Sequence, residues 1–223
     1  MKRIAKGNHD PMNDDTTQVL LDRYRNGDAS VVGELFQLHR ERLRRMVSVR
    51  LSPHVRSRVD ESDILQETLL QANNHIQDYI EKPPMPFFIW LRWLTSQQIN
   101  QCHRFHLDAQ KRDARKREDI GNANSPLSAI LATQFALSTP SKIASKKEMV
   151  AIAIRVLDQL KPTDREILSM RHFENMTNQE IAIALKIEPS NASTRYVRAL
   201  SKLRRALDKF PGFSEMPKDK DQA

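Results

Sequence analysis

The stretch TNQEIAIALKIEPSNASTRYVRALSKLRR, residues 177–205, decides the fold of the C-terminal part of this chain. Thr177 and Glu180 have the spacing of a capping box, which predicts that a helix begins there. The sequence KIEP then predicts a turn. Pro189 suits the first position of a second helix, because the backbone N–H at that position has no intrahelical partner. A short helix, a tight turn and a second helix have the spacing of a helix-turn-helix.

The second helix of this pair has two unlike faces. Ala192, Tyr196 and Ala199 are expected to point inward. The outward face holds small hydrogen-bonding side chains and arginines, which read base edges and bind phosphates in the major groove. The alternative is a helical hairpin with a solvated basic face. The candidate residues for DNA contact are Ser190, Asn191, Ser193, Thr194, Arg195 and Arg198, followed by Lys202 for the DNA backbone.

The composition limits the class of protein. The chain has 223 residues and a formal net charge of +8, which suits a polyanionic partner, either nucleic acid or an anionic membrane. A merely basic surface is an equally open alternative. Its single cysteine, Cys102, allows no internal disulfide and fits a reducing compartment. The N-terminus has no apolar segment typical of a signal peptide, and no run of about 18 apolar residues predicts a membrane span. We therefore expect a cytoplasmic protein without membrane insertion.

Helical periodicity recurs along the chain, so the predicted fold class is all-α, with two small helical domains joined by a flexible linker. The second domain would be the helix-turn-helix domain. Within it, a further capping box is predicted at Thr163 and Glu166, and in the first domain the first helix is expected to begin at Thr16. A short helix is expected inside the linker, at residues 127–135. The predicted parts are a disordered N-terminus (1–15), a helical domain (16–118), the linker (119–146), the helix-turn-helix domain (147–209) and a disordered tail (210–223).

An acidic ridge interrupts the basic chain. In DESDILQETLLQANNHI, residues 60–76, the carboxylates Asp60, Asp63 and Glu67 recur at one- and two-turn spacing and are expected on one helix face. No histidine or cysteine joins them at ligand spacing, which disfavours a metal site. A solvated face and a docking ridge for a basic partner both remain open.

A long helix follows the proline-rich segment EKPPMPFF, residues 81–88, and changes from aromatic to basic along its length. Aromatic rings stack on bases and cations hold phosphates, so this order suits single-stranded or partly opened nucleic acid. The alternative places Trp90 in the core and leaves the basic run solvated. The candidate residues are Trp90, Trp93, Gln97, Gln101, Arg104, Lys111, Arg112 and Arg115.

Three blocks in this order resemble the sigma-70 family of bacterial RNA polymerase sigma factors, in its small extracytoplasmic-function group. DESDILQETLLQA resembles the helix that docks on the clamp helices of the polymerase, and FFIWLRWL with HRFHLDAQKRDARKRE resembles the promoter-melting and −10-recognition helix. Residues 157–207 resemble the −35-recognition domain. The segment between the domains is too short for the middle domain of housekeeping sigma factors, and the basic block is similar to a planctomycete-type branch.

The resemblance implies a transcription initiation factor that directs RNA polymerase core to promoters by reading −10 and −35 elements and assisting DNA melting. Its partners would be promoter DNA, the clamp helices and flap of the polymerase, and the anti-sigma factor common in this group. The location would be cytoplasmic and nucleoid-associated. The resemblance also assigns a polymerase contact to Asp60, Asp63, Gln66 and Glu67.

The sequence departs from the family pattern at Gln97 and Gln101, where Asn and Asp are usual, and at Lys186, where Gly is usual. The bases that it recognises therefore cannot be transferred from relatives. We find no phosphate-binding glycine loop, metal-ligand set or nucleophile–base pair, so neither an enzyme nor a cofactor is expected. The alternative functions are a stand-alone helix-turn-helix transcriptional regulator and a helical adaptor that binds only protein.

Overall fold

The structure is a computed structural model, and it describes residues 11–51, 53–56, 58–113 and 143–210. All regular secondary structure in these ranges is helical, which confirms the predicted all-α class. The chain divides into two compact units. The first comprises residues 1–119 and 170–189, and the second comprises residues 120–169 and 190–223.

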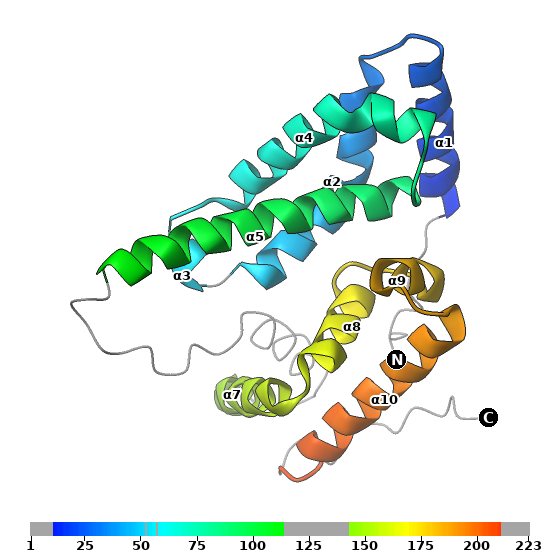
Figure 1. The fold of residues 1–223 in the computed structure, drawn as a ribbon. Helices are drawn as coiled ribbons and strands as arrows, with labels where there is room; N and C mark the ends of the chain where they lie inside the picture. Colours follow the sequence, from blue (N-terminus) through cyan, green and yellow to red (C-terminus); the bar gives the residue numbers. More distant parts are fainter. Residues whose placement is uncertain (1–10, 52, 57, 114–142, 211–223) are drawn as a thin grey trace. The chain divides into compact units, whose positions relative to one another are not determined.

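The first unit is built around helices α2 and α5, which contact each other and also α4. These three helices lie side by side, with α1 along α2 (Figure 1). The short helices α3 and α9 contact α5. The bounds are α1 Pro11–Arg25, α2 Val31–Arg50, α3 Pro53–Arg56, α4 Glu61–Glu81, α5 Phe87–Asp113 and α9 Asn178–Leu185.

The core of this unit lies where the apolar stripes of α2, α4 and α5 meet. Leu35, Leu43, Ile76 and Leu91 are among the most completely buried side chains. Burial of a side chain of this size stabilises the fold by roughly 1.5–3 kcal/mol. The core therefore fixes the outward faces of α4 and α5, on which the candidate residues lie.

The second unit contains α7 (Ile143–Gln159), most of α8 (Pro162–His172) and nearly all of α10 (Pro189–Leu207). Ala199 and Leu203 of α10 are buried, as are Leu157 and Leu168 on the other two helices. An ion pair of 2.7 Å joins Lys202 Nζ to Asp164 Oδ2 and so ties α10 to α8. Helix α10 thus has one packed side and one exposed side.

Two predicted helix starts are wrong. Helix α1 begins at Pro11 rather than Thr16, so the predicted disordered N-terminus extends too far into the chain. Helix α8 begins at Pro162, which places Thr163 inside the helix and excludes the predicted capping box with Glu166. Proline takes the first helical position because it needs no hydrogen-bond partner for a backbone N–H.

The predicted linker helix at residues 127–135 and the predicted tail at 211–223 lie outside the described residues. Within the described ranges, no helix combines the length and the apolar composition that crossing a bilayer requires.

His39 is a titratable side chain in the core of the first unit. Its Nε2 atom lies 3.0 Å from Thr17 Oγ1, and its ring lies 5.8 Å and 5.6 Å from the rings of Phe87 and Phe88. Burial, aided by the nearby charge of Arg42, lowers the pKa of His39 from its usual 6.5 to about 4. The neutral imidazole is thus the form that the fold accommodates.

We expect acid to destabilise the first unit through His39. The unfolded chain protonates this residue below pH 6.5 and the folded chain only near pH 4, so folding loses stability as the pH falls between these values. At pH 5.5 the expected loss is about 1.2 kcal/mol relative to neutral pH. The measurement is urea unfolding followed by tryptophan fluorescence, since both tryptophans lie on α5. The variant His39→Gln should show a shallower pH dependence, and an equal slope would contradict this role.

Candidate functional site

Helix α10 presents the polar face that the sequence predicts. Ala192 and Ala199 are fully buried, whereas the predicted third inward residue, Tyr196, is half-buried. Ser193 is also half-buried, so it is the least accessible of the predicted DNA contacts on this helix. The remaining candidates are exposed: Ser190, Asn191, Thr194, Arg195, Arg198 and Lys202.

Two of these exposed side chains already have partners within the chain. Thr194 Oγ1 donates a hydrogen bond of 2.9 Å to the carbonyl of Ser190, and Lys202 forms its ion pair with Asp164. A phosphate that binds Lys202 must therefore compete with a carboxylate. Arg195 and Arg198 are the exposed cations nearest the N-terminal end of α10, which is the end that meets base edges in a helix-turn-helix.

The turn before α10 is defined by local hydrogen bonds. Glu180 N donates to Thr177 Oγ1 at 3.1 Å and Thr177 N donates to Glu180 Oε2 at 2.7 Å, which confirms the predicted capping box of α9. Lys186 ends α9 in the left-handed conformation with φ 54° and ψ 49°. Ile187 N then donates to the Ala182 carbonyl at 2.9 Å. Helix α10 begins at Pro189, as predicted.

We expect Lys186→Gly to stabilise the helix-turn-helix segment by about 1 kcal/mol, because glycine adopts positive φ without a Cβ penalty. Thermal unfolding followed by circular dichroism measures this gain. Lys186→Ala is the matched control, since it removes the same side chain and keeps the Cβ atom. An equal gain in both variants would assign the effect to the lysine side chain and not to the backbone.

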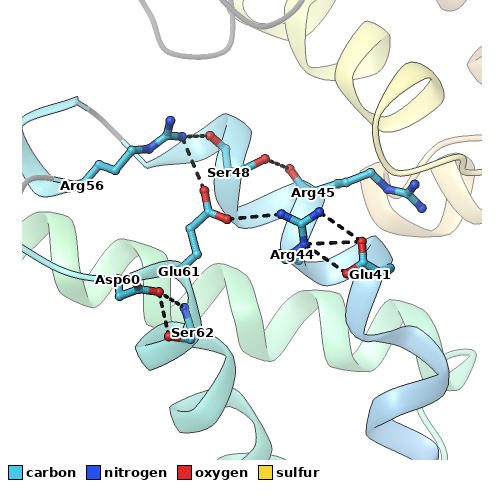
Figure 2. A network of polar contacts seen from close by, with 8 residues as sticks. All are labelled: Glu41, Arg44, Arg45, Ser48, Arg56, Asp60, Glu61 and Ser62. Atoms are coloured by element: carbon cyan, nitrogen blue, oxygen red, sulfur yellow. Dashed lines mark hydrogen bonds and ion pairs between the residues drawn. The ribbon is translucent and has the colours of Figure 1, made fainter.

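The acidic ridge on α4 divides into two parts. Asp60 precedes the helix and caps it, with Asp60 Oδ1 accepting hydrogen bonds from Ser62 N at 2.7 Å and Ser62 Oγ at 2.6 Å (Figure 2). Asp63 completes this capping box by accepting from Asp60 N at 3.3 Å. The hydrogen bonds from Ser62 lower the pKa of Asp60. Both residues are exposed, and both also serve to begin the helix.

The second part of the ridge projects from the middle of α4. Gln66 and Glu67 are exposed, and Gln71 Nε2 donates a hydrogen bond of 3.1 Å to Glu67 Oε1. Leu70, one turn further along, is 52% exposed, although apolar residues of its size are usually buried.

Glu61, for which the sequence predicts no role, is the first residue of α4 and lies in a network of charges. Its carboxylate lies 3.9 Å from Arg44 of α2 and 3.9 Å from Arg56 of α3 (Figure 2). Arg44 also pairs with Glu41 at 3.1 Å, and Arg56 donates to the carbonyl of Ser48. The network places the α4 start against α2 and α3. In the sequence, Glu61 is marked only as an acidic residue in the first turn of a helix. Such residues are too common to predict this network.

A pocket of about 390 Å³ lies between α4 and α5 in the first unit. One wall is a stacked pair, Tyr79 and Trp90, with ring centroids 4.7 Å apart. Trp93 also lines the pocket and is 49% exposed, whereas Trp90 is 6% exposed. The other lining residues are Gln71, His75, Asp78, Lys82, Pro84, Leu94, Gln97 and Gln98.

The proline-rich turn beside this pocket is held by Tyr79, whose hydroxyl donates a hydrogen bond of 3.0 Å to the Met85 carbonyl. Burial raises the pKa of Tyr79 to about 12, so the hydroxyl stays protonated and donates at neutral pH. The sequence did not reveal this link, because any tyrosine on the apolar side of α4 fits the helical pattern equally well.

The predicted residues of α5 therefore have different surroundings. Trp90 is a core residue, while Gln97, Gln101 and Arg104 are exposed on the same helix as Trp93. Lys111 and Arg112 lie on the described backbone of α5, but their side chains are outside the description, as is all of Arg115.

A cluster of charged residues outside the predicted sites is also prominent. Glu174, between α8 and α9, is fully buried and pairs with Arg50 and Arg92, which are 124 and 82 residues away in the sequence. Nothing in the sequence pattern predicts contacts at such a separation.

The comparisons with known proteins fit this geometry. Residues 151–203 match the family model of sigma-70 region 4, which confirms a helix-turn-helix in this part of the chain. The chain is also similar to CnrH in the structure of CnrH in complex with the cytosolic domain of CnrY. That similarity has 20% identity and a TM-score of 0.52, and it covers 86% of this chain and 96% of that chain. At this identity it supports the fold alone. No curated protein matches the sequence.

Proposed function

We propose that this chain is a sigma factor of the sigma-70 family, in the extracytoplasmic-function group, that brings RNA polymerase core to specific promoters. The observation that carries the proposal is the match of residues 151–203 to sigma-70 region 4, combined with the exposed polar face of α10 inside that segment. In this function α10 reads the −35 element, with Arg195 and Arg198 near the base edges. The planctomycete-type branch stays a prediction.

The pocket between α4 and α5 supports a role in opening the −10 element. An unstacked base needs an aromatic surface, and each base–aromatic stack contributes roughly 1–3 kcal/mol. Trp93 offers half its surface beside the pocket, and the Tyr79–Trp90 stack provides a rigid wall. Gln97 and Lys82 add polar groups to the lining. Capture of a base here offsets part of the cost of separating the strands.

The exposed part of the α4 ridge supports docking on the polymerase. Gln66, Glu67 and Leu70 project from a helix whose other side is fixed in the core, so their positions are set before binding. An acidic and partly apolar surface on a basic protein favours a basic protein partner over DNA. We assign this surface to the clamp helices of the polymerase, and the flap to the helix-turn-helix domain.

In this proposal the chain performs no covalent chemistry, and its location is cytoplasmic, with the nucleoid. CnrH was solved with the cytosolic domain of CnrY. By analogy, we extend the proposal to a protein partner, an anti-sigma factor, that holds this chain inactive.

The experiment that tests the function is size-exclusion chromatography of the purified chain with sigma-free bacterial RNA polymerase core. Comigration is expected for a sigma factor. A stand-alone helix-turn-helix regulator, the alternative, predicts no comigration together with intact binding to duplex DNA. A helical adaptor predicts neither comigration nor salt-sensitive DNA binding.

A further inference from the structure

The exposed side of α10 carries two different stripes of side chains. Residues three, four and seven positions apart share one face of a helix, and helices in the major groove read bases from such a face. The first stripe is cationic and includes Arg195 and Arg198. The second stripe, formed by Ser190, Thr194 and Val197, has no charge. Phosphate binding therefore does not account for the second stripe.

Val197 is an exposed apolar side chain in the second stripe. Its exposed fraction is 46%, and within α10, every residue of which is described, no other large apolar side chain is exposed. Single exposed apolar side chains are ordinary on protein surfaces, so exposure alone assigns no role to Val197. Its position does, because it lies on the helix that a helix-turn-helix places in the major groove.

Val197 and Thr194 are restricted in conformation before DNA binds. A valine in a helix strongly prefers one χ1 rotamer, so its two methyl groups have defined positions. Thr194 Oγ1 donates its hydrogen to the Ser190 carbonyl at 2.9 Å, which uses its only donor inside the helix. Thr194 therefore offers DNA a methyl group and an acceptor oxygen. Because residues three positions apart are neighbours on a helix surface, the methyl groups of Thr194 and Val197 can contact the same base.

The chemistry of the second stripe fits thymine. In the major groove, thymine has a C5-methyl group and an O4 acceptor, whereas cytosine has an amino donor and no methyl group. A valine gains free energy by burying the thymine methyl group. Against cytosine or a purine, the same valine leaves a polar group of the base edge without a partner, which costs free energy. The second stripe thus suits thymine, while arginines such as Arg198 suit guanine.

We propose that Val197, together with the methyl group of Thr194, selects a thymine in the DNA that α10 reads. The inference rests on DNA reading by α10, which the proposed sigma factor shares with the alternative, a stand-alone regulator. It adds a specificity-determining side chain that is neither polar nor charged. Recognition acts through the C5-methyl group of the base, so uracil at the same position loses the contact.

The test removes single methyl groups from the DNA. Duplexes with a randomised −35 region are selected for binding to the full chain in complex with sigma-free polymerase core. In the most strongly bound duplex, each thymine is then replaced in turn by deoxyuridine, which pairs identically and lacks the methyl group. Affinities are measured by fluorescence anisotropy. The unchanged chain should lose about fourfold in affinity at one thymine, as expected for the loss of one buried methyl group.

The variant Val197→Ala provides the second half of the test. It should fold normally, because alanine is a good helix former and the position is exposed. Its affinities for the thymine and deoxyuridine duplexes should differ by less than about twofold, since the two changes remove the same contact. The matched control is Val19→Ala, which truncates an exposed valine of α1 and should retain the fourfold loss. Circular dichroism checks that both variants have the helix content of the unchanged chain.

Two results would overturn the inference: a selected sequence in which no thymine responds to loss of its methyl group, and an equal response in Val197→Ala and the unchanged chain. Failure of the proposed function is recognised separately, because the chain would then not bind the polymerase core. In that case the selection uses the full chain alone, since a stand-alone regulator reads DNA through the same helix. A chain that selects no sequence in either setting would overturn both the role of Val197 and DNA reading by α10.

Discussion

Charge reversal at Glu67 is expected to reduce binding to sigma-free RNA polymerase core by about 100-fold or more, because like charges placed opposite one another cost several kcal/mol. Glu67 is exposed in the middle of α4, where its carboxylate accepts a hydrogen bond from the nearby Gln71 side chain. The variant Glu67→Lys should therefore retain its fold. Binding is measured by comigration on size exclusion and by titration of labelled core.

The structure determines which control is informative. Glu81→Lys makes the same charge change at an exposed residue near the C-terminal end of α4 and should leave polymerase binding intact. Asp63→Lys is less informative, because Asp63 completes the capping box and its loss also weakens the helix start. Equal binding of the polymerase core by Glu67→Lys and by the unchanged chain would contradict the proposal that this ridge docks on the polymerase.

Arg195→Ala is expected to weaken binding to the −35 element by about 1–3 kcal/mol and to relax the sequence preference at one position. Arg195 is exposed in the N-terminal part of α10, beside the helix face that carries the buried Ala192 and Ala199. The measurement is selection of bound sequences from a randomised −35 region in the presence of polymerase core.

Arg205→Ala provides the comparison, since Arg205 is exposed near the C-terminal end of the same helix, far from the base-reading end. It should weaken binding uniformly across sequences or have no effect, and it should lower the salt dependence slightly if it contacts phosphate. If the sequence preference of Arg195→Ala is unaltered, Arg195 does not contact a base edge. It then contacts a phosphate or makes no contact with DNA.

The sequence predicted the helix-turn-helix in detail because its signals are local. The capping box of Thr177 and Glu180, the turn at Lys186 and the start of α10 at Pro189 each depend on residues within one or two turns of one another. The same kind of signal gave a wrong prediction at Thr163. The preceding proline occupies the first helical position, so Thr163 lies inside the helix and cannot cap it. Asp60 also caps a helix, although its spacing with Asp63 and Glu67 predicts only a surface ridge.

The contacts that join distant segments could not be predicted in this way. Glu174 looked like one acidic residue in a short loop, and its role depends on arginines from two other helices. The pocket beside Trp93 likewise depends on how α4 packs on α5, which periodicity alone does not give. The structure shows that the side chain of Trp93 is exposed and that of Trp90 is buried, although both tryptophans lie on the same helix. The sequence does not distinguish them.

The left-handed residue at the end of α9 bears on how chains of this type are recognised from sequence. Lys186 has the backbone geometry usually reserved for glycine, at a modest conformational cost. A search pattern that requires glycine at this position would reject this chain, although the backbone N–H groups of Lys186 and Ile187 close its turn with hydrogen bonds to α9. Patterns that weigh the cap before the turn and the proline after it would retain such sequences.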